Sequence, residues 1–98
     1  MADVRSGRDI DSALVKKGFL RFHEGDHVRY RFYGPSGDNP VARTKISHGM
    51  LGRTVGAKLI SLMAKQLHLT KKQFLQLIDC TMTEKAYRET LRGKGIAV

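Results

Sequence analysis

Residues 27–33 carry side chains whose types and spacing could do chemistry. Polar and apolar residues alternate strictly along this stretch, which predicts a β-strand with one buried face. The alternation divides the side chains into an apolar set, Val28, Tyr30 and Phe32, and a polar set, His27, Arg29, Arg31 and Tyr33. The polar side would offer an imidazole, which can exchange a proton near neutral pH, beside two guanidinium groups that suit an anionic partner.

Two further strands would extend this polar side. Arg43 and Lys45 alternate with small or apolar residues and would point outward, whereas Leu20 and Phe22 are expected to face the core. Turn-forming residues separate the segments, so we expect an antiparallel meander. Its strands would cover residues 19–23, 27–33 and 41–47. One outer, water-facing surface would then gather Arg29, Arg31, Arg43 and Lys45.

Helical patterns precede and follow the strands. Asp9 can cap the first helix, and Gly18 follows its last turn. Thr70 and Gln73 form a capping-box pattern at the start of a later helix. The expected helices cover residues 10–17, begin near Thr54, begin at Thr70, and cover about 82–91. The predicted fold class is therefore α+β, a three-stranded antiparallel sheet with helices on one face and additional C-terminal helices.

Length and charge limit the possible functions. The chain has 98 residues, of which 41% are hydrophobic and 28% charged, as in one soluble domain over residues 1–98. Its net charge of +9 makes a polyanion the first partner to consider. No apolar run is long enough to span a membrane. The single cysteine, Cys80, excludes an intrachain disulfide, so we expect a reducing, cytoplasmic location.

The sequence predicts neither a metal site nor a cofactor. His23 and His27 lie four residues apart, but no cysteine pair or His-Glu helix motif accompanies them. The glycine-rich residues 49–52 lack the lysine and hydroxyl residue that end a phosphate-binding P-loop. Chemistry at this protein would therefore depend on its own side chains.

Three short motifs resemble the HicA family of toxins. They are Lys17-Gly18-Phe19, Gly25-Asp26-His27 at the start of a strand, and Ile46-Ser47-His48-Gly49 at the end of another. The resemblance covers about residues 8–67 and implies a fold like the double-stranded-RNA-binding domain, with α-β-β-β-α order. HicA proteins are ribonucleases that act on messenger RNA and are neutralised by a HicB antitoxin. His27 matches their catalytic histidine, although Asp26 stands where the family has serine.

The resemblance and the polar strand face together give a leading hypothesis and two alternatives. A metal-independent endoribonuclease would use His27 as general base, His48 as a weaker second candidate, and the outer cations to hold RNA. A module of the same fold could instead bind nucleic acid without cleaving it. A third possibility is a protein-interaction module, in which the helices over about residues 70–91 contact an antitoxin or a second copy of the chain.

Overall fold

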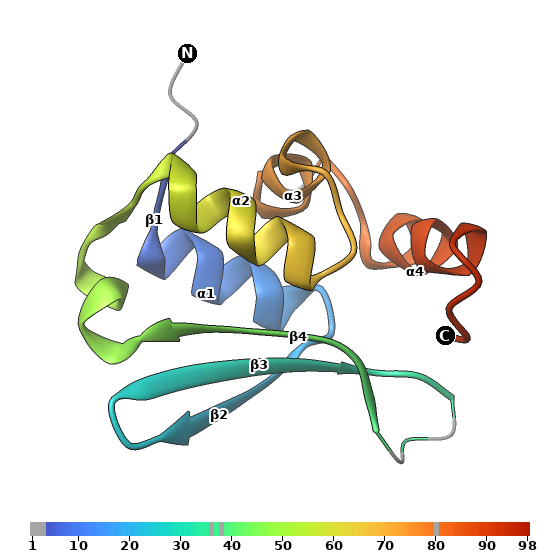
Figure 1. Ribbon diagram of the computed structural model, residues 1–98, viewed down its shortest axis with the longest axis horizontal. Helices are drawn as coiled ribbons and strands as arrows, with labels where there is room; N and C mark the ends of the chain where they lie inside the picture. The colour runs from blue at the N-terminus through green and yellow to red at the C-terminus, as the bar shows by residue number, and fades with distance from the viewer. Residues whose placement is uncertain (1–3, 36, 38, 80) are drawn as a thin grey trace.

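A three-stranded antiparallel sheet carries the outer surface, and helices cover its other face. The computed structural model describes residues 4–35, 37, 39–79 and 81–98, so Cys80 lies outside the described residues. The elements are β1 (Arg5–Ser6), α1 (Gly7–Lys16), β2 (Leu20–Glu24), β3 (His27–Tyr33), β4 (Pro40–Ser47), the 3-10 helix η1 (His48–Gly52), β5 (Thr54–Val55), α2 (Ala57–Gln66), α3 (Lys71–Ile78) and α4 (Glu84–Gly93). Figure 1 shows α1, α2 and α3 on one side of the sheet, with α4 beyond its end. The predicted α+β class is confirmed at this level.

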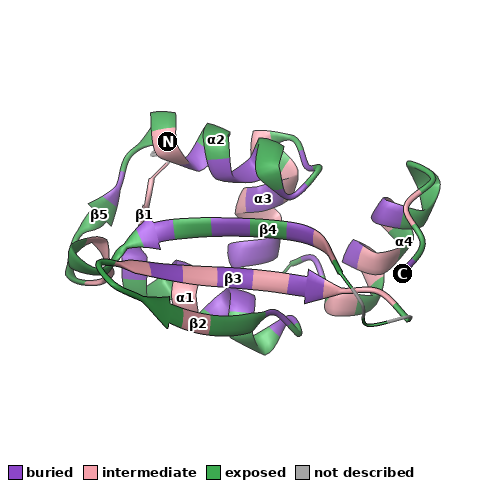
Figure 2. Cartoon of the chain, turned by 60° about the horizontal axis from the view of Figure 1, so that its bottom comes forward, coloured by how far each residue is buried: buried purple, intermediate pink, exposed green. Residues whose placement is uncertain are grey.

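The central strand β3 has the predicted alternation of buried and accessible residues. The strand order is β2-β3-β4, with both neighbours antiparallel to β3. Val28, Tyr30 and Phe32 are fully buried on the helix-covered face, whereas Arg29 and Arg31 between them are partly exposed. The same alternation continues across β4, as the stripes of buried and exposed residues in Figure 2 show. A period of two thus fixes which side chains reach the open face.

The facing predicted for the first strand of the sheet is wrong. The register pairs Leu20 with Arg31 and Phe22 with Arg29, so both apolar residues lie on the outer face. Leu20 is 54% exposed, and the guanidinium of Arg31 lies 4.6 Å from the centre of the Phe22 ring. Phe19, just before β2, takes the core position instead and is 2% exposed. Adjacent apolar residues at 19 and 20 gave no alternation from which the facing could be read.

The first helix begins earlier than predicted. Ser6, and not Asp9, is its N-cap, and the Ser6 hydroxyl accepts a hydrogen bond from the Asp9 backbone N–H at 3.1 Å. A hydroxyl placed there satisfies one of the free N–H groups of the first turn. The end of the helix is as predicted, because Gly18 follows with a φ of +97°, a conformation that favours glycine.

A second, two-stranded ladder was not predicted. Arg5–Ser6 pairs with Thr54–Val55, so residue 54 lies in β5 and the helix expected to begin there starts at Ala57. Within α2, Ile60 is fully buried, whereas Leu62 is 51% exposed.

The C-terminal helices contribute to the same core as the sheet. Phe74 of α3 and Tyr87 of α4 are fully buried in one cluster with β3 and the other helices. The Tyr87 ring lies 5.6 Å from Phe19 and 5.0 Å from Phe32 between ring centres. Aromatic pairs at these separations stabilise a core beyond the area that they bury. The apolar faces of α3 and α4 are therefore largely occupied within the protein itself.

Candidate nucleic-acid interface

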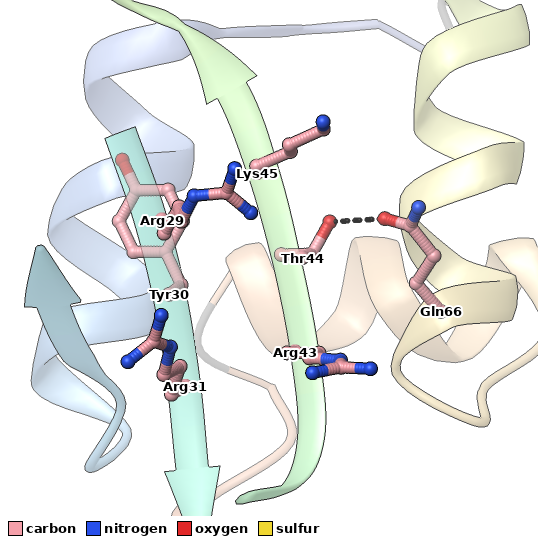
Figure 3. Close-up of a pocket in the computed structure, with 7 residues that line it drawn as sticks. All are labelled: Arg29, Tyr30, Arg31, Arg43, Thr44, Lys45 and Gln66. Carbon is pink, nitrogen blue, oxygen red and sulfur yellow. Dashed lines mark hydrogen bonds between the residues drawn. The ribbon is translucent and has the colours of Figure 1, made fainter. Parts of the chain in front are cut away.

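The structure places the four predicted cations on the uncovered face of the sheet. Arg29 lies directly opposite Lys45, and Arg31 lies directly opposite Arg43, across the β3–β4 pair. Directly opposed residues on one face of an antiparallel pair are about 5 Å apart at their β-carbons. We call this uncovered side of the sheet the outer face, and it carries these four cations together with His27. Figure 3 shows the cationic side chains projecting from the same side of the two strands.

One carboxylate contacts two of these cations. A Glu24 oxygen lies 2.8 Å from the Arg29 Nε, and its other oxygen accepts a hydrogen bond from an Arg31 Nη at 3.3 Å. Within the part of the chain that the structure describes, Arg43 and Lys45 make no ion pair. Positive charge on the outer face therefore exceeds negative charge, and it is least compensated along β4.

A hollow of about 160 Å³ lies among these side chains. It is lined by Arg29, Tyr30, Arg31, Arg43, Thr44, Lys45 and Gln66. At its edge the Thr44 hydroxyl donates a hydrogen bond of 2.7 Å to the side-chain oxygen of Gln66, which connects β4 to α2 (Figure 3). Several cations around one small concavity suit a phosphate group, because each of them can donate hydrogen bonds to its oxygens.

His27 opens β3 at one end of the outer face. It lies opposite Ser47 and two residues before Arg29, so its side chain is on the same side of the sheet as the cations. Together with Lys45 and Gln66 it lines a second hollow of about 240 Å³. The imidazole of His27 and the ammonium group of Lys45 thus border one hollow, and Arg29 follows on the same face of β3.

His48, the second candidate histidine, lies elsewhere. It is the first residue of η1, and its backbone N–H donates to the Asp26 carbonyl at 2.6 Å. Its ring lies 5.8 Å from the ring of His23, between centres, beside the β2–β3 turn. Because Ser47 lies opposite His27 on the outer face, the next residue, His48, turns to the other face, on which His23 lies. Among the described residues, no group of three potential metal ligands occurs.

A hydrogen-bond network on the covered face holds β3 against α1. The Tyr30 hydroxyl donates to Asp11 at 2.6 Å, and Arg21 donates to the other oxygen of the same carboxylate at 2.7 Å. Burial, with the neighbouring Asp11 carboxylate, raises the pKa of the Tyr30 phenol above its ordinary value. Tyr30 therefore stays neutral and fixes the position of the strand that carries His27, Arg29 and Arg31.

Three residues of the interface were not predicted from the sequence. No role in binding was predicted for Glu24, Thr44 or Gln66. Thr44 did carry a signal, because a hydroxyl among inward-facing side chains needs a hydrogen-bond partner. Its partner is 22 residues away in the chain, so the pattern of β4 alone could not identify it.

Comparisons of the chain with protein-family models, curated proteins and solved structures find no match. Function is therefore inferred from the charge and geometry of the outer face. No described helix has both the length and the apolar character needed to cross a membrane.

Proposed function

We propose that this protein is an RNA-acting, HicA-like endoribonuclease that needs no metal and uses His27 as its general base. The observation that carries the proposal is the common face of His27 and the four cations on neighbouring strands. Histidine suits proton removal near neutral pH, and cations beside it suit the phosphate whose charge increases during the reaction. RNA in the cytoplasm would be the substrate.

The chemistry would begin at the 2′-hydroxyl of the RNA. Neutral His27 takes its proton, the 2′-oxygen attacks the adjacent phosphorus, and the bond to the 5′-oxygen breaks. The products are a 2′,3′-cyclic phosphate and a 5′-hydroxyl, whose proton comes from water. Lys45 and Arg29, nearest to His27 on the outer face, would stabilise the extra negative charge on the phosphate oxygens.

One observation favours a second candidate function, nucleic-acid binding without cleavage. The leaving oxygen needs a proton, and the second histidine that could supply it, His48, has its ring against His23. A non-catalytic module would use the same cations and would leave RNA intact.

Protein partners are part of the proposal. The resemblance implies a HicB-like antitoxin, which would compete with RNA for the outer face. A homodimer would have to use exposed apolar residues such as Leu20 and Leu62, because the main apolar residues of α3 and α4 lie in the protein's own core.

The first prediction concerns His27→Ala. In the presence of EDTA, we expect wild-type protein to cleave a labelled RNA, and His27→Ala to do so about 10²- to 10⁴-fold more slowly, because general-base catalysis supplies that range. A single 2′-deoxy substitution should protect the bond that follows it. His23→Ala is the matched control, because His23 pairs with Val28 on the face opposite to His27 and lines none of the hollows on the outer face.

Binding and cleavage are measured separately. Arg43→Ala with Lys45→Ala should weaken RNA binding and lower the slope of log affinity against log salt by about 1.4. Cleavage that persists in His27→Ala contradicts the catalytic role. Binding of RNA by wild type without cleavage favours the second candidate function. Binding whose affinity does not change with salt would contradict any binding of RNA to the outer face.

A further inference from the structure

Gln66 lies where three hollows meet along the free edge of β4. The hollow among the cations and the hollow beside His27 share Gln66 and Lys45. A third hollow, of about 470 Å³, shares Gln66 and Arg43 and ends at His68. The three hollows are adjacent, since they share these lining residues, and we refer to them together as the groove between β4 and the end of α2. Because β4 has eight residues, the groove follows roughly 26 Å of strand, space for on the order of four nucleotides.

The amide of Gln66 is exposed, makes one hydrogen bond to the sheet and still has hydrogen-bonding capacity. Its oxygen accepts the Thr44 hydroxyl at 2.7 Å, which leaves a second lone pair on that oxygen. The amide nitrogen has no partner among the described residues. Gln66 therefore presents an adjacent donor and acceptor to the groove, with Thr44 as the residue that positions them.

The backbone edge of β4 faces the same groove. β4 is an edge strand, and the His68 Nε2–H donates to the Val41 carbonyl at 3.1 Å on the side away from β3. Backbone groups of alternate residues in a strand point the same way, so those of Arg43 and Lys45 also point toward the groove. Their side chains lie on the outer face, so a phosphate could be held there while a base enters the groove.

We propose that this groove selects single-stranded RNA by holding one unpaired base against the Gln66 amide. Every nucleobase has an adjacent donor and acceptor on its Watson–Crick edge, which the amide can pair with, whichever base it is. In a duplex that edge is already used, whereas bases of a single strand can be turned outward. The inference rests on the proposed binding of RNA to the outer face and adds a residue that recognises strandedness.

The test compares two octanucleotides, octauridine and octa-(N3-methyluridine), by fluorescence anisotropy. The methyl group blocks the Watson–Crick edge while the phosphates and the base rings stay. We expect wild-type protein to bind octauridine about tenfold more tightly, since the methylated strand lacks the N3–H donor and its methyl group keeps the amide away from the neighbouring carbonyl. Gln66→Ala should bind both strands equally, with unchanged affinity for the methylated one. Gln76→Ala, on α3 and outside the groove, is the matched control and should keep the tenfold ratio.

The outcomes separate this inference from the proposed function. Equal binding of both strands by wild type, or a tenfold ratio that survives in Gln66→Ala, overturns the role of Gln66 while RNA binding stands. Binding of neither strand overturns both. Gln66→Met is the second variant: it keeps a side chain of similar length but has neither the amide donor nor the amide acceptor, so it should also lose the ratio. Circular dichroism confirms that each variant is folded.

Discussion

Glu24 controls how much charge the outer face offers to a ligand. Its carboxylate contacts both Arg29 and Arg31, and half of its side-chain surface is exposed, at 50%. A carboxylate in this position competes with phosphate for the two guanidinium groups. The prediction is that Glu24→Gln increases RNA affinity at low salt by about three- to tenfold, because the two arginines become available for phosphate contacts.

The matched control changes charge equally at a distance. Glu89→Gln on the exposed surface of α4 also adds one positive charge but removes no contact on the outer face. The two variants are compared by anisotropy titration, with urea unfolding to check that stability changes by less than about 1 kcal/mol, as for exposed ion pairs. An equal increase in RNA affinity in both variants would mean that only the net charge of the protein matters, which would contradict an RNA interface on the outer face.

At the scale of single residues, the positions of the cations could be predicted from the sequence, but the contact of Glu24 with two of them could not. Arg29, Arg31, Arg43 and Lys45 follow from a period of two, which each strand carries in its own residues. The contact of Glu24 depends on the facing of β2, which the sequence did not determine. Gln66 became recognisable only through Thr44, from a different element.

At the scale of the elements, the start of α1 packs closely against η1 and so fixes the path of the chain between β4 and α2. Gly7 begins α1, and its backbone N–H donates to the Arg53 carbonyl at 2.8 Å. A β-carbon at Gly7 would lie 1.9 Å from the Met50 carbonyl oxygen and 2.9 Å from the Leu51 α-carbon. Backbone atoms cannot move aside as a flexible side chain can, so only glycine fits there.

We therefore expect Gly7→Ala to lower the free energy of unfolding by about 1–3 kcal/mol, the usual cost of overpacking. Gly49→Ala is the control within η1 itself, since a β-carbon there would have nothing within 4 Å. It should change stability by less than about 0.5 kcal/mol. The free energies of unfolding of both variants are measured by urea denaturation. Equal values for Gly7→Ala and Gly49→Ala would show that α1 does not pack closely against η1.

Short elements are the part of the fold that the sequence could not predict. β1 and β5 have two residues each, too few for any periodicity, and they exist because Arg5–Ser6 meets Thr54–Val55 across about fifty residues of chain. That pairing also moved the beginning of α2 to Ala57. By contrast, β3 and the capping box at Thr70 carry local signals, and both were predicted correctly.

At the scale of the whole molecule, Tyr87 joins α4 to the sheet and makes the free energy of unfolding depend on pH in the alkaline range. Its ring packs against both Phe19 and Phe32, and its hydroxyl donates to the buried Leu67 carbonyl at 3.1 Å. Burial raises the pKa of the Tyr87 phenol above the value of about 10 that it has in the unfolded chain. Above pH 10 the folded protein therefore retains a phenol proton that the unfolded chain loses. The contribution of this phenol to the free energy of unfolding is fully present below pH 10 and decreases as the pH rises above 10.

The last prediction compares wild type with Tyr87→Phe in urea titrations between pH 7 and pH 11. At pH 7 the variant should be less stable by about 1 kcal/mol, because the Leu67 carbonyl loses its donor. Above pH 10 wild type should lose up to about 1.4 kcal/mol per pH unit more than the variant, which has no phenol to ionise at this position. The two curves should then converge. A constant difference up to pH 11 would mean that the Tyr87 hydroxyl reaches water, and that α4 is held to the sheet less closely than its aromatic contacts indicate.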